Sequence, residues 1–413
     1  MSSQLKKMWI YFIGGAAVLI YILIESRGEG DLTIFLKASR DLADGKNMYL
    51  IMYNEWFRYY YDVLFALLLF PLTFLPFYFA KLTWLALNVF FVFRIWKIIN
   101  HWLPLNQWSE KTKIIFTLLS FLFVMRFLRD NFHVAQVTIF ILYLTLEGLY
   151  HIGKNKKIAG SAFLALGITI KILPVVFIPY LFYRKEWKAA LYTIAFVAFF
   201  LLLPALFIGY HFNNELLTER WNLVNPSSQQ HILDTSERSF HSLTTLLATL
   251  LVENSGDMHA LPLKRNIADV PLERLGWVIN IARGILILLT LYFLRTLPFK
   301  NVFSPLQRLY EVSYICLIIP LIFPHQQHYA FFFIFPAAAY LLFYLISMEK
   351  KNTLLLIFLA LIYLATNGSI LLGAFNKYYE HYKILTYGAL LMVVLLAVCR
   401  PGQEVLTINN KKN

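Results

Sequence analysis

The chain has 413 residues, of which 59% are hydrophobic and 15% are charged, and its mean hydropathy is +0.61. Soluble domains carry about 25% charged residues, so this composition excludes an ordinary soluble protein and predicts an all-α polytopic integral membrane protein. The net charge of +14 comes from basic residues in short segments between apolar runs. This is the positive-inside distribution of membrane proteins, and it does not indicate a nucleic-acid partner.

The first apolar run, residues 8–24, predicts a retained membrane span, because no small-residue cleavage site follows it. Lys6 and Lys7 predict a cytoplasmic N-terminus and therefore an external loop at residues 25–62. In this loop Asp31 opens an amphipathic stretch that ends at Tyr49. Asp31 has two interpretations: a helix N-cap or solvated residue beside the membrane, or a functional carboxylate at the membrane surface.

Residues 63–100 hold two apolar runs joined at Leu75-Pro76, so one of them is expected to be short or to lie flat. A polar group then surrounds the next predicted external turn. Its members are Arg126, Arg129, Asp130, Asn131 and Gln136. Two of its features have simpler explanations, because Arg126 can reach the lipid headgroups and Arg129 with Asp130 can form an interfacial pair.

Basic connectors flank residues 158–182 on both sides, so this segment is expected to enter and leave on one face. Lys171 and Pro174 in its middle predict two half-helices, which membranes accept only where protein or a cavity covers the broken backbone. Both cysteines, Cys316 and Cys399, lie in apolar runs, which argues against a disulfide framework or a thiolate metal site.

The polar stretch 210–273 predicts a second external loop, which contains Glu237 and Arg238. His325 and His328 lie in a later predicted external turn. Their i, i+3 spacing allows a zinc pair, but two histidines alone are a weak metal signal, so neither a metal nor another cofactor is expected. We expect one membrane domain over residues 1–413, with about 10–12 membrane segments, some of them incomplete.

The unusual polar residues therefore gather on one predicted face of the membrane. A carboxylate there can take a proton from a hydroxyl nucleophile. Nearby cations and histidines can hold a phosphate leaving group as its charge develops. This combination favours an enzyme that transfers a group from a membrane lipid phosphate to an acceptor hydroxyl.

These segments, taken in order, resemble the polytopic GT-C glycosyltransferases, and most closely glycosyltransferase family 87. The similarity is spread over most of the chain. It lies in Asp31 to Tyr49, the turn with Asn131 and Gln136, the Lys171-Ile172-Leu173-Pro174 break followed by 183–187, residues 237–247 and Pro324 to Tyr329.

The resemblance implies a GT-C-like bundle with re-entrant half-helices and an external amphipathic jaw helix. It implies inverting transfer of a hexose, with mannose expected, from a polyprenyl-phosphate donor to a glycolipid, glycan or protein. Asp31 would be the general base. Arg129, Lys171, Arg238 and His328 would bind the donor phosphate, and Asn131, Gln136, Glu237 and His325 would orient the substrates. The enzyme would lie in the inner (plasma) membrane with its site on the external or periplasmic side.

Three other functions compete with this interpretation. A transporter or flippase of a lipid-linked sugar would share the broken helices, but it predicts an internal repeat and charges near mid-membrane. A ligase that moves a whole glycan from a lipid pyrophosphate predicts a basic large loop, whereas residues 210–273 carry more acidic than basic residues. A structural scaffold would not explain the placement of Asp31, Lys171 and His328.

Overall fold

The computed structural model describes residues 3–54, 57–225, 240–253, 255, 260–294, 298–299, 304–348 and 352–402. Within these ranges the fold is helical, with one isolated antiparallel bridge between Tyr53 and Phe57. Six helices are long and apolar enough to cross a membrane, or seven segments when one bent helix pair is counted as a span. Five shorter apolar helices accompany them. The predicted fold class, an all-α multi-pass membrane protein, is thereby confirmed.

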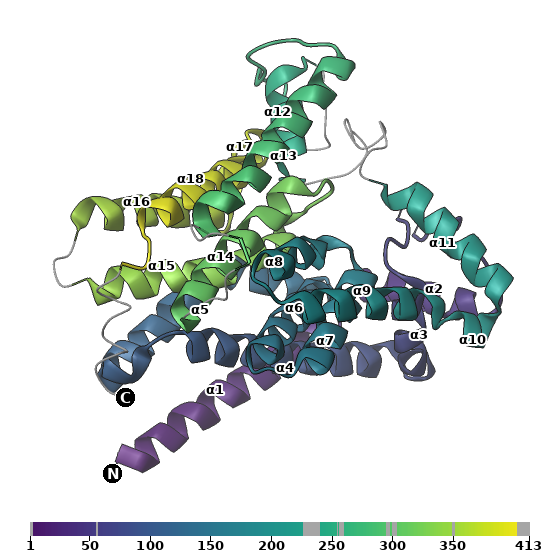
Figure 1. Ribbon diagram of the computed structural model, residues 1–413, viewed down its shortest axis with the longest axis horizontal. Coiled ribbons are helices and arrows are strands. Elements are labelled where there is room, and N and C mark those ends of the chain that lie inside the picture. The colour runs from purple at the N-terminus through teal and green to yellow at the C-terminus, as the bar shows by residue number, and fades with distance from the viewer. Residues whose placement is uncertain are drawn as a thin grey trace.

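In Figure 1, α2 to α4 and α6 to α9 of the first half form one group of helices, whereas α5 packs against α15 and η5 of the second half. The bounds are α1 (Ser3–Glu25), α2 (Asp31–Ala43), α3 (Val63–Leu69), η1 (Phe70–Phe74), α4 (Phe77–Trp102), η2 (Leu105–Gln107), α5 (Glu110–His133), α6 (Thr138–Gly153), α7 (Lys157–Ile170), η3 (Leu173–Val176), α8 (Phe177–Tyr183) and α9 (Trp187–Leu202). Most of α1 projects away from this group as a lone helix.

The second half supplies the other helices. They are α10 (Ala205–Ile208), α11 (Tyr210–Val224), α12 (Leu243–Leu251), α13 (Leu272–Leu294), α14 (Pro305–Ile322), η5 (His328–Ile334), α15 (Phe335–Ser347), α16 (Thr353–Asn367), η6 (Gly368–Ile370), η7 (Gly373–Phe375), α17 (Asn376–His381) and α18 (Ile384–Val398). α14 and the η5–α15 segment are the most deeply buried of the long apolar helices, with 83% of each lying inside the molecule. They therefore form the centre onto which the other helices pack.

Two predicted interruptions of the apolar runs are confirmed. Leu75 and Pro76 end the short α3–η1 segment and begin the long α4. α7 ends at Ile170, Lys171 has extended backbone, and the chain resumes as η3 and α8. Leu75, before Pro76, has extended backbone, as proline disfavours helical geometry in the residue before it. Pro174 acts differently, because its ring would clash in a continuous helix with the carbonyl of Ile170, where α7 ends. That the second interrupted segment turns back within the membrane remains a prediction.

α6 and α7 pack at very short range because glycine lies on both contact surfaces. A Cβ atom at Gly148 would lie 2.8 Å from the carbonyl oxygen of Gly160, and one at Gly160 would lie 2.6 Å from that of Gly148. Small residues let membrane helices approach this closely. The tight pair fixes the C-terminal end of α7, where Lys171 lies, relative to the N-terminal end of α6, which follows Gln136.

Ion pairs join α4 to α6 and the end of α8 to α14. Arg94 of α4 makes two hydrogen bonds to Glu147 of α6, at 2.6 and 3.2 Å. Arg184 is bound to Glu311 of α14, and Tyr180 also donates to Glu311, at 3.0 Å. Buried charges are stable only when paired in this way. These contacts hold the helix group together far along α4 and α6 from the residues of the candidate site.

Candidate active site

Asp31 lies at the start of α2, and its position is fixed by a close contact between two loops. Gly30 is the N-cap residue, with no side-chain cap, so the predicted alternative of an Asp31 N-cap is wrong. The Asp31 backbone N–H donates to the carbonyl oxygen of Val134 at 2.8 Å. A Cβ at Gly30 would lie 2.7 Å from that same oxygen, so only glycine fits there. The backbone therefore places Asp31 directly against the turn after α5.

Gln136 holds the Asp31 carboxylate from that turn. Its side-chain nitrogen donates to Oδ2 of Asp31. Its side-chain oxygen accepts from the hydroxyl of Tyr61 and from the backbone N–H of Val137, both at 2.9 Å. Because both of its ends are bound and it is 1% exposed, Gln136 has one amide orientation and presents a single donor to Asp31.

The environment of Asp31 sets its proton affinity. Burial raises the pKa of its carboxyl to about 6, while the hydrogen bond from Gln136 and the positive charge of Lys171 oppose that rise. A carboxylate with a pKa just below neutrality is mostly ionised at pH 7 and is still a better base than an ordinary aspartate. This is the chemistry expected of a general base.

Two side chains near the start of α4 hold both loops in place. The ammonium group of the buried Lys81 contacts the carbonyl oxygens of Gly28, Glu29 and His133 at 2.9, 3.4 and 3.1 Å. One turn along, the indole N–H of Trp84 donates to the carbonyl of Ala135 at 3.0 Å. The segments just before Asp31 and just before Gln136 are therefore attached to the same helix.

Lys171 lies at the edge of this group, where α7 ends. Its ammonium nitrogen is 5.6 Å from the centre of the Tyr61 ring, within range of a cation–π contact. Next to it, Arg220 of α11 forms an ion pair with the fully buried Asp62 and donates to the carbonyl of Thr169 at 2.9 Å. The structure therefore brings together three residues predicted from distant segments, namely Asp31, Gln136 and Lys171.

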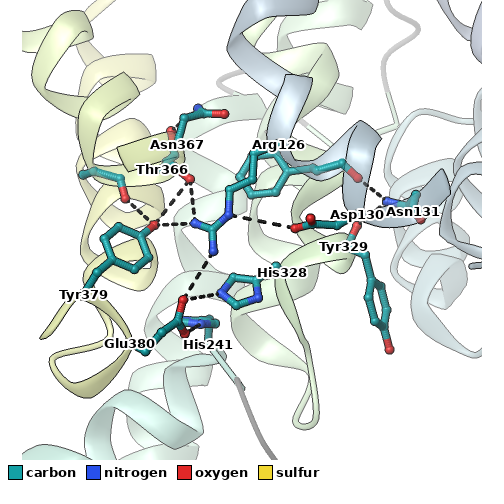
Figure 2. Close-up of polar contacts among 12 residues, drawn as sticks. Arg126, Asp130, Asn131, His241, His328, Tyr329, Thr366, Asn367, Tyr379 and Glu380 are labelled. Carbon is teal, nitrogen blue, oxygen red and sulfur yellow. Dashed lines mark hydrogen bonds and ion pairs between the residues drawn. The ribbon is translucent and has the colours of Figure 1, made fainter. Parts of the chain in front are cut away.

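A second polar cluster centres on Glu380 at the end of α17, and Figure 2 shows its carboxylate facing two imidazole rings and a guanidinium group. His328 Nε2 lies 2.9 Å from Oε1 of Glu380, and His241 Nε2 lies 3.0 Å from Oε2. The two imidazole centroids are 4.4 Å apart. Glu380 thus joins segments that are far apart in the sequence.

Arg126 of α5 completes this cluster from the opposite side (Figure 2). It lies 3.5 Å from Oε1 of Glu380 and donates to the Tyr379 hydroxyl at 2.8 Å. It is 4% exposed, so the alternative in which Arg126 reaches the lipid headgroups is wrong. A weaker contact of 3.9 Å joins it to Asp130, one turn further along α5.

Asn131 connects the two clusters. Its side-chain nitrogen donates to the carbonyl of Tyr329, the residue after His328, at 2.9 Å. Its own backbone carbonyl accepts from the N–H of Gln136 at 2.8 Å. The predicted site residues Asn131, Gln136, His328 and Asp31 therefore lie in one continuous network around the last turn of α5.

Three non-glycine residues in this region have left-handed backbone, with φ of 54° at Ala135, 55° at His325 and 56° at Lys383. Ala135 directly precedes Gln136, whereas His325 lies three residues before His328 and Lys383 three residues after Glu380. Such conformations cost about 1–3 kcal/mol and are concentrated at functional sites. Asn54, Asn155, Lys185 and Phe299 have the same backbone conformation elsewhere in the described chain, so it is the strain at Ala135, beside Gln136, that bears on the site.

The remaining predicted residues have other surroundings. Arg129 is exposed on α5. His325 packs edge-on against Phe240, with ring centroids 4.9 Å apart, and His328 pairs with Glu380 and His241 instead of with His325. Glu237 and Arg238 lie outside the described residues.

A family model described as Glycosyltransferase family 87 matches residues 59–303, which is more than half of the chain. The chain belongs to glycosyltransferase family 87. No match to a curated protein or to a solved structure was found. The match runs from the loop with Tyr61 through the broken α7 segment, so it covers Gln136 and Lys171 but begins after Asp31. The family assignment identifies this protein as a membrane glycosyltransferase and confirms the resemblance read from the sequence.

Sequence reasoning missed several polar residues of the family 87 protein. They are Tyr61, Lys81, Arg220, His241, Tyr379 and Glu380. Lys81 carried a signal, because it is a single lysine in the first turns of a long apolar helix, where a charge requires partners. Glu380 and His241 carried none, because their partners are more than fifty residues away and neither has a distinctive local motif.

Proposed function

We propose that this protein is an inverting hexosyltransferase that uses a polyprenyl-phosphate sugar, with mannose expected, on the external face of the inner (plasma) membrane. The observation that carries the proposal is the Asp31 carboxylate, which Gln136 orients and whose pKa burial raises to about 6, in a member of glycosyltransferase family 87. The acceptor would be a hydroxyl group of a glycolipid, a glycan or a protein.

In the proposed reaction Asp31 accepts the proton of the acceptor hydroxyl as its oxygen attacks the anomeric carbon of the sugar. The bond between that carbon and the phosphate oxygen breaks, and its electron pair stays on the phosphate. The products are the glycosylated acceptor, the polyprenyl phosphate and a protonated Asp31. Attack opposite the leaving group inverts the anomeric configuration.

Cationic and hydrogen-bonding groups of the two clusters would stabilise the phosphate as its charge develops. Lys171 is suited to this role because it acts electrostatically on Asp31 and lies at a break in the helix, where its side chain can turn toward a ligand. His328 is suited because Glu380 fixes its ring and it is only partly buried. Asn131 and Gln136 would orient these groups. Roles for Arg129, Arg238, Glu237 and His325 remain predictions.

The test compares Asp31→Asn with Asp44→Asn in proteoliposomes that contain a radiolabelled polyprenyl-phosphate mannose and a cell-envelope extract as acceptor. Asp44 follows the end of the same helix and is exposed, with a salt bridge to Lys46 at 3.2 Å, so it controls for removal of a carboxylate. Loss of a general base should reduce transfer by roughly 10²- to 10⁴-fold, whereas Asp44→Asn should transfer normally.

Two results would contradict the proposal. Full transfer by a well-folded Asp31→Asn protein would exclude Asp31 as the base. Transfer by the wild type from a nucleotide sugar, but from no polyprenyl-phosphate sugar, would exclude the proposed donor class.

A further inference from the structure

The cluster around Glu380, which holds His328 for the proposed transfer, is also a set of possible metal ligands. One ring nitrogen each of His241 and His328 and a carboxylate oxygen of Glu380 lie within 4.8 Å of one another. Two imidazoles and one carboxylate are a common ligand set for divalent transition metals. We propose that His241, His328 and Glu380 bind one divalent transition-metal ion of the zinc, cobalt or manganese type.

The distances fit this assignment. Each imidazole nitrogen is 2.9 or 3.0 Å from a different oxygen of the same carboxylate. Metal–nitrogen and metal–oxygen bonds of about 2.0–2.2 Å in tetrahedral geometry give ligand–ligand separations of about 3.3–3.6 Å. An ion can therefore replace the hydrogen bonds in this cluster after the three side chains move apart by roughly half an ångström.

The backbone already holds these ligands in place. The N–H of His241 donates to the carbonyl of Gln326 at 2.9 Å, and its carbonyl accepts from the hydroxyl of Thr386 at 2.8 Å. Arg126 and the Asn131–Tyr329 contact hold Glu380 and η5 from the other side (Figure 2). A metal site needs this preorganisation, because ligands that must first be gathered bind weakly.

The His241 ring has a single arrangement inside the protein. It is fully buried, and among the described residues its Nδ1 atom has no hydrogen-bond partner, whereas its Nε2 atom faces the Glu380 carboxylate at 3.0 Å. An imidazole binds a metal ion through an unprotonated ring nitrogen. This arrangement therefore presents Nε2 of His241 beside the carboxylate that would share the ion.

The charge balance also favours a cation. The positive charge of Arg126 is offset by Glu380 and Asp130, with which it forms ion pairs at 3.5 and 3.9 Å. Lys383 adds one further positive charge near His241. The two positive and two negative charges of these four groups cancel, so no net positive charge remains to bind the donor phosphate. A divalent ion would supply that charge.

The role of the ion rests on the proposed function. The ion would hold an oxygen of the donor phosphate at the coordination position that the three protein ligands leave open. The metal would thereby stabilise the leaving group, while Asp31 would still remove the proton. The site itself, however, is defined by its ligands and can be measured without any sugar transfer.

The experiment titrates Co²⁺ into the full-length protein, purified through a tag without histidine and treated with a chelator, and records the visible absorption of the bound ion. We expect one Co²⁺ per chain, displaced by Zn²⁺. Loss of an outer-shell partner typically weakens metal binding roughly 10- to 100-fold. His241→Gln and Glu380→Gln remove direct ligands and should each weaken Co²⁺ binding by at least this much. His211→Gln, an exposed histidine of α11, should bind Co²⁺ like the wild type.

Absence of a Co²⁺ spectrum from the folded wild type would overturn the proposal, and so would a spectrum that persists unchanged in a folded His241→Gln protein. The transfer assay separates this result from the proposed function. Transfer that continues after complete metal removal would refute the role of the ion in the reaction while leaving the proposed glycosyl transfer intact. Co²⁺ binding without any transfer would establish the site and refute the proposed reaction.

Discussion

Gln136 is predicted to set the pH range in which the enzyme works. The Gln136→Leu substitution keeps a side chain of similar size but removes the hydrogen bond to the Asp31 carboxylate, and that bond lowers the pKa of Asp31. Its loss should therefore raise the pKa further. The base must be ionised to act, so activity rises as pH increases through this pKa.

The size of the shift follows from the strength of the bond. A hydrogen bond to a charged group contributes about 1.5–3 kcal/mol, and one pKa unit corresponds to about 1.4 kcal/mol. The acid limb of the profile should therefore move from about 6 to about 7–8. At pH 7 this would reduce transfer roughly 2- to 10-fold, and most of the loss should be recovered near pH 9.

The assay is kcat/KM for the donor as a function of pH, because this ratio reports the ionisation of the free enzyme. Tyr61→Phe is the matched comparison, since it removes the neighbouring hydrogen bond to Gln136 and leaves the bond to Asp31 in place. It should shift the profile less. Asn100→Leu, at the other end of α4, controls for loss of a partly buried amide. A Gln136→Leu profile that is lower throughout but has the wild-type midpoint would refute the reasoning.

Two further predictions concern the scaffold. Lys81→Ala should lower kcat at least tenfold with little change in the donor KM, because Lys81 contacts the backbone around Asp31 and no predicted substrate group. Lys81→Arg should restore part of the activity. Equal losses in kcat and in donor affinity would contradict this positioning role. Gly160→Ala should destabilise the protein by about 1–3 kcal/mol, measured by thermal unfolding in detergent, because its Cβ would meet the Gly148 carbonyl at 2.6 Å. Gly284→Ala, which has open space around it, should leave stability unchanged or raise it by up to about 1 kcal/mol through the higher helix propensity of alanine, and an equal loss in both variants would rule out the close contact as the cause.

Local features of the fold could be predicted from the sequence. Pro76 and Pro174 interrupt apolar runs by a covalent restriction of the backbone, so their effect needs no knowledge of the partners. The amphipathic pattern after Asp31 gives α2, whose buried residues include Leu32, Phe35 and Leu42. Proline positions and the spacing of apolar residues therefore predict these breaks and the helix α2.

The second cluster could not be predicted in the same way. Arg126 and Glu380 are 254 positions apart, and the bent arrangement of α17 and α18 brings the carboxylate back to α5. Nothing near Glu380 in the sequence marks it, since it lies in a short polar segment typical of a loop between helices. Long-range packing, which local patterns do not encode, selects this carboxylate as the partner of His328.

The contacts of Lys81 also make the position of Asp31 independent of the orientation of α1. Lys81 ties Gly28 and Glu29 to α4, whereas most described side chains of α1 between residues 14 and 20 are exposed. Helices adapt to bilayers of different thickness by tilting. Tilting of α1 would therefore pivot about its last residues and leave the Asp31 carboxylate in place as membrane composition changes.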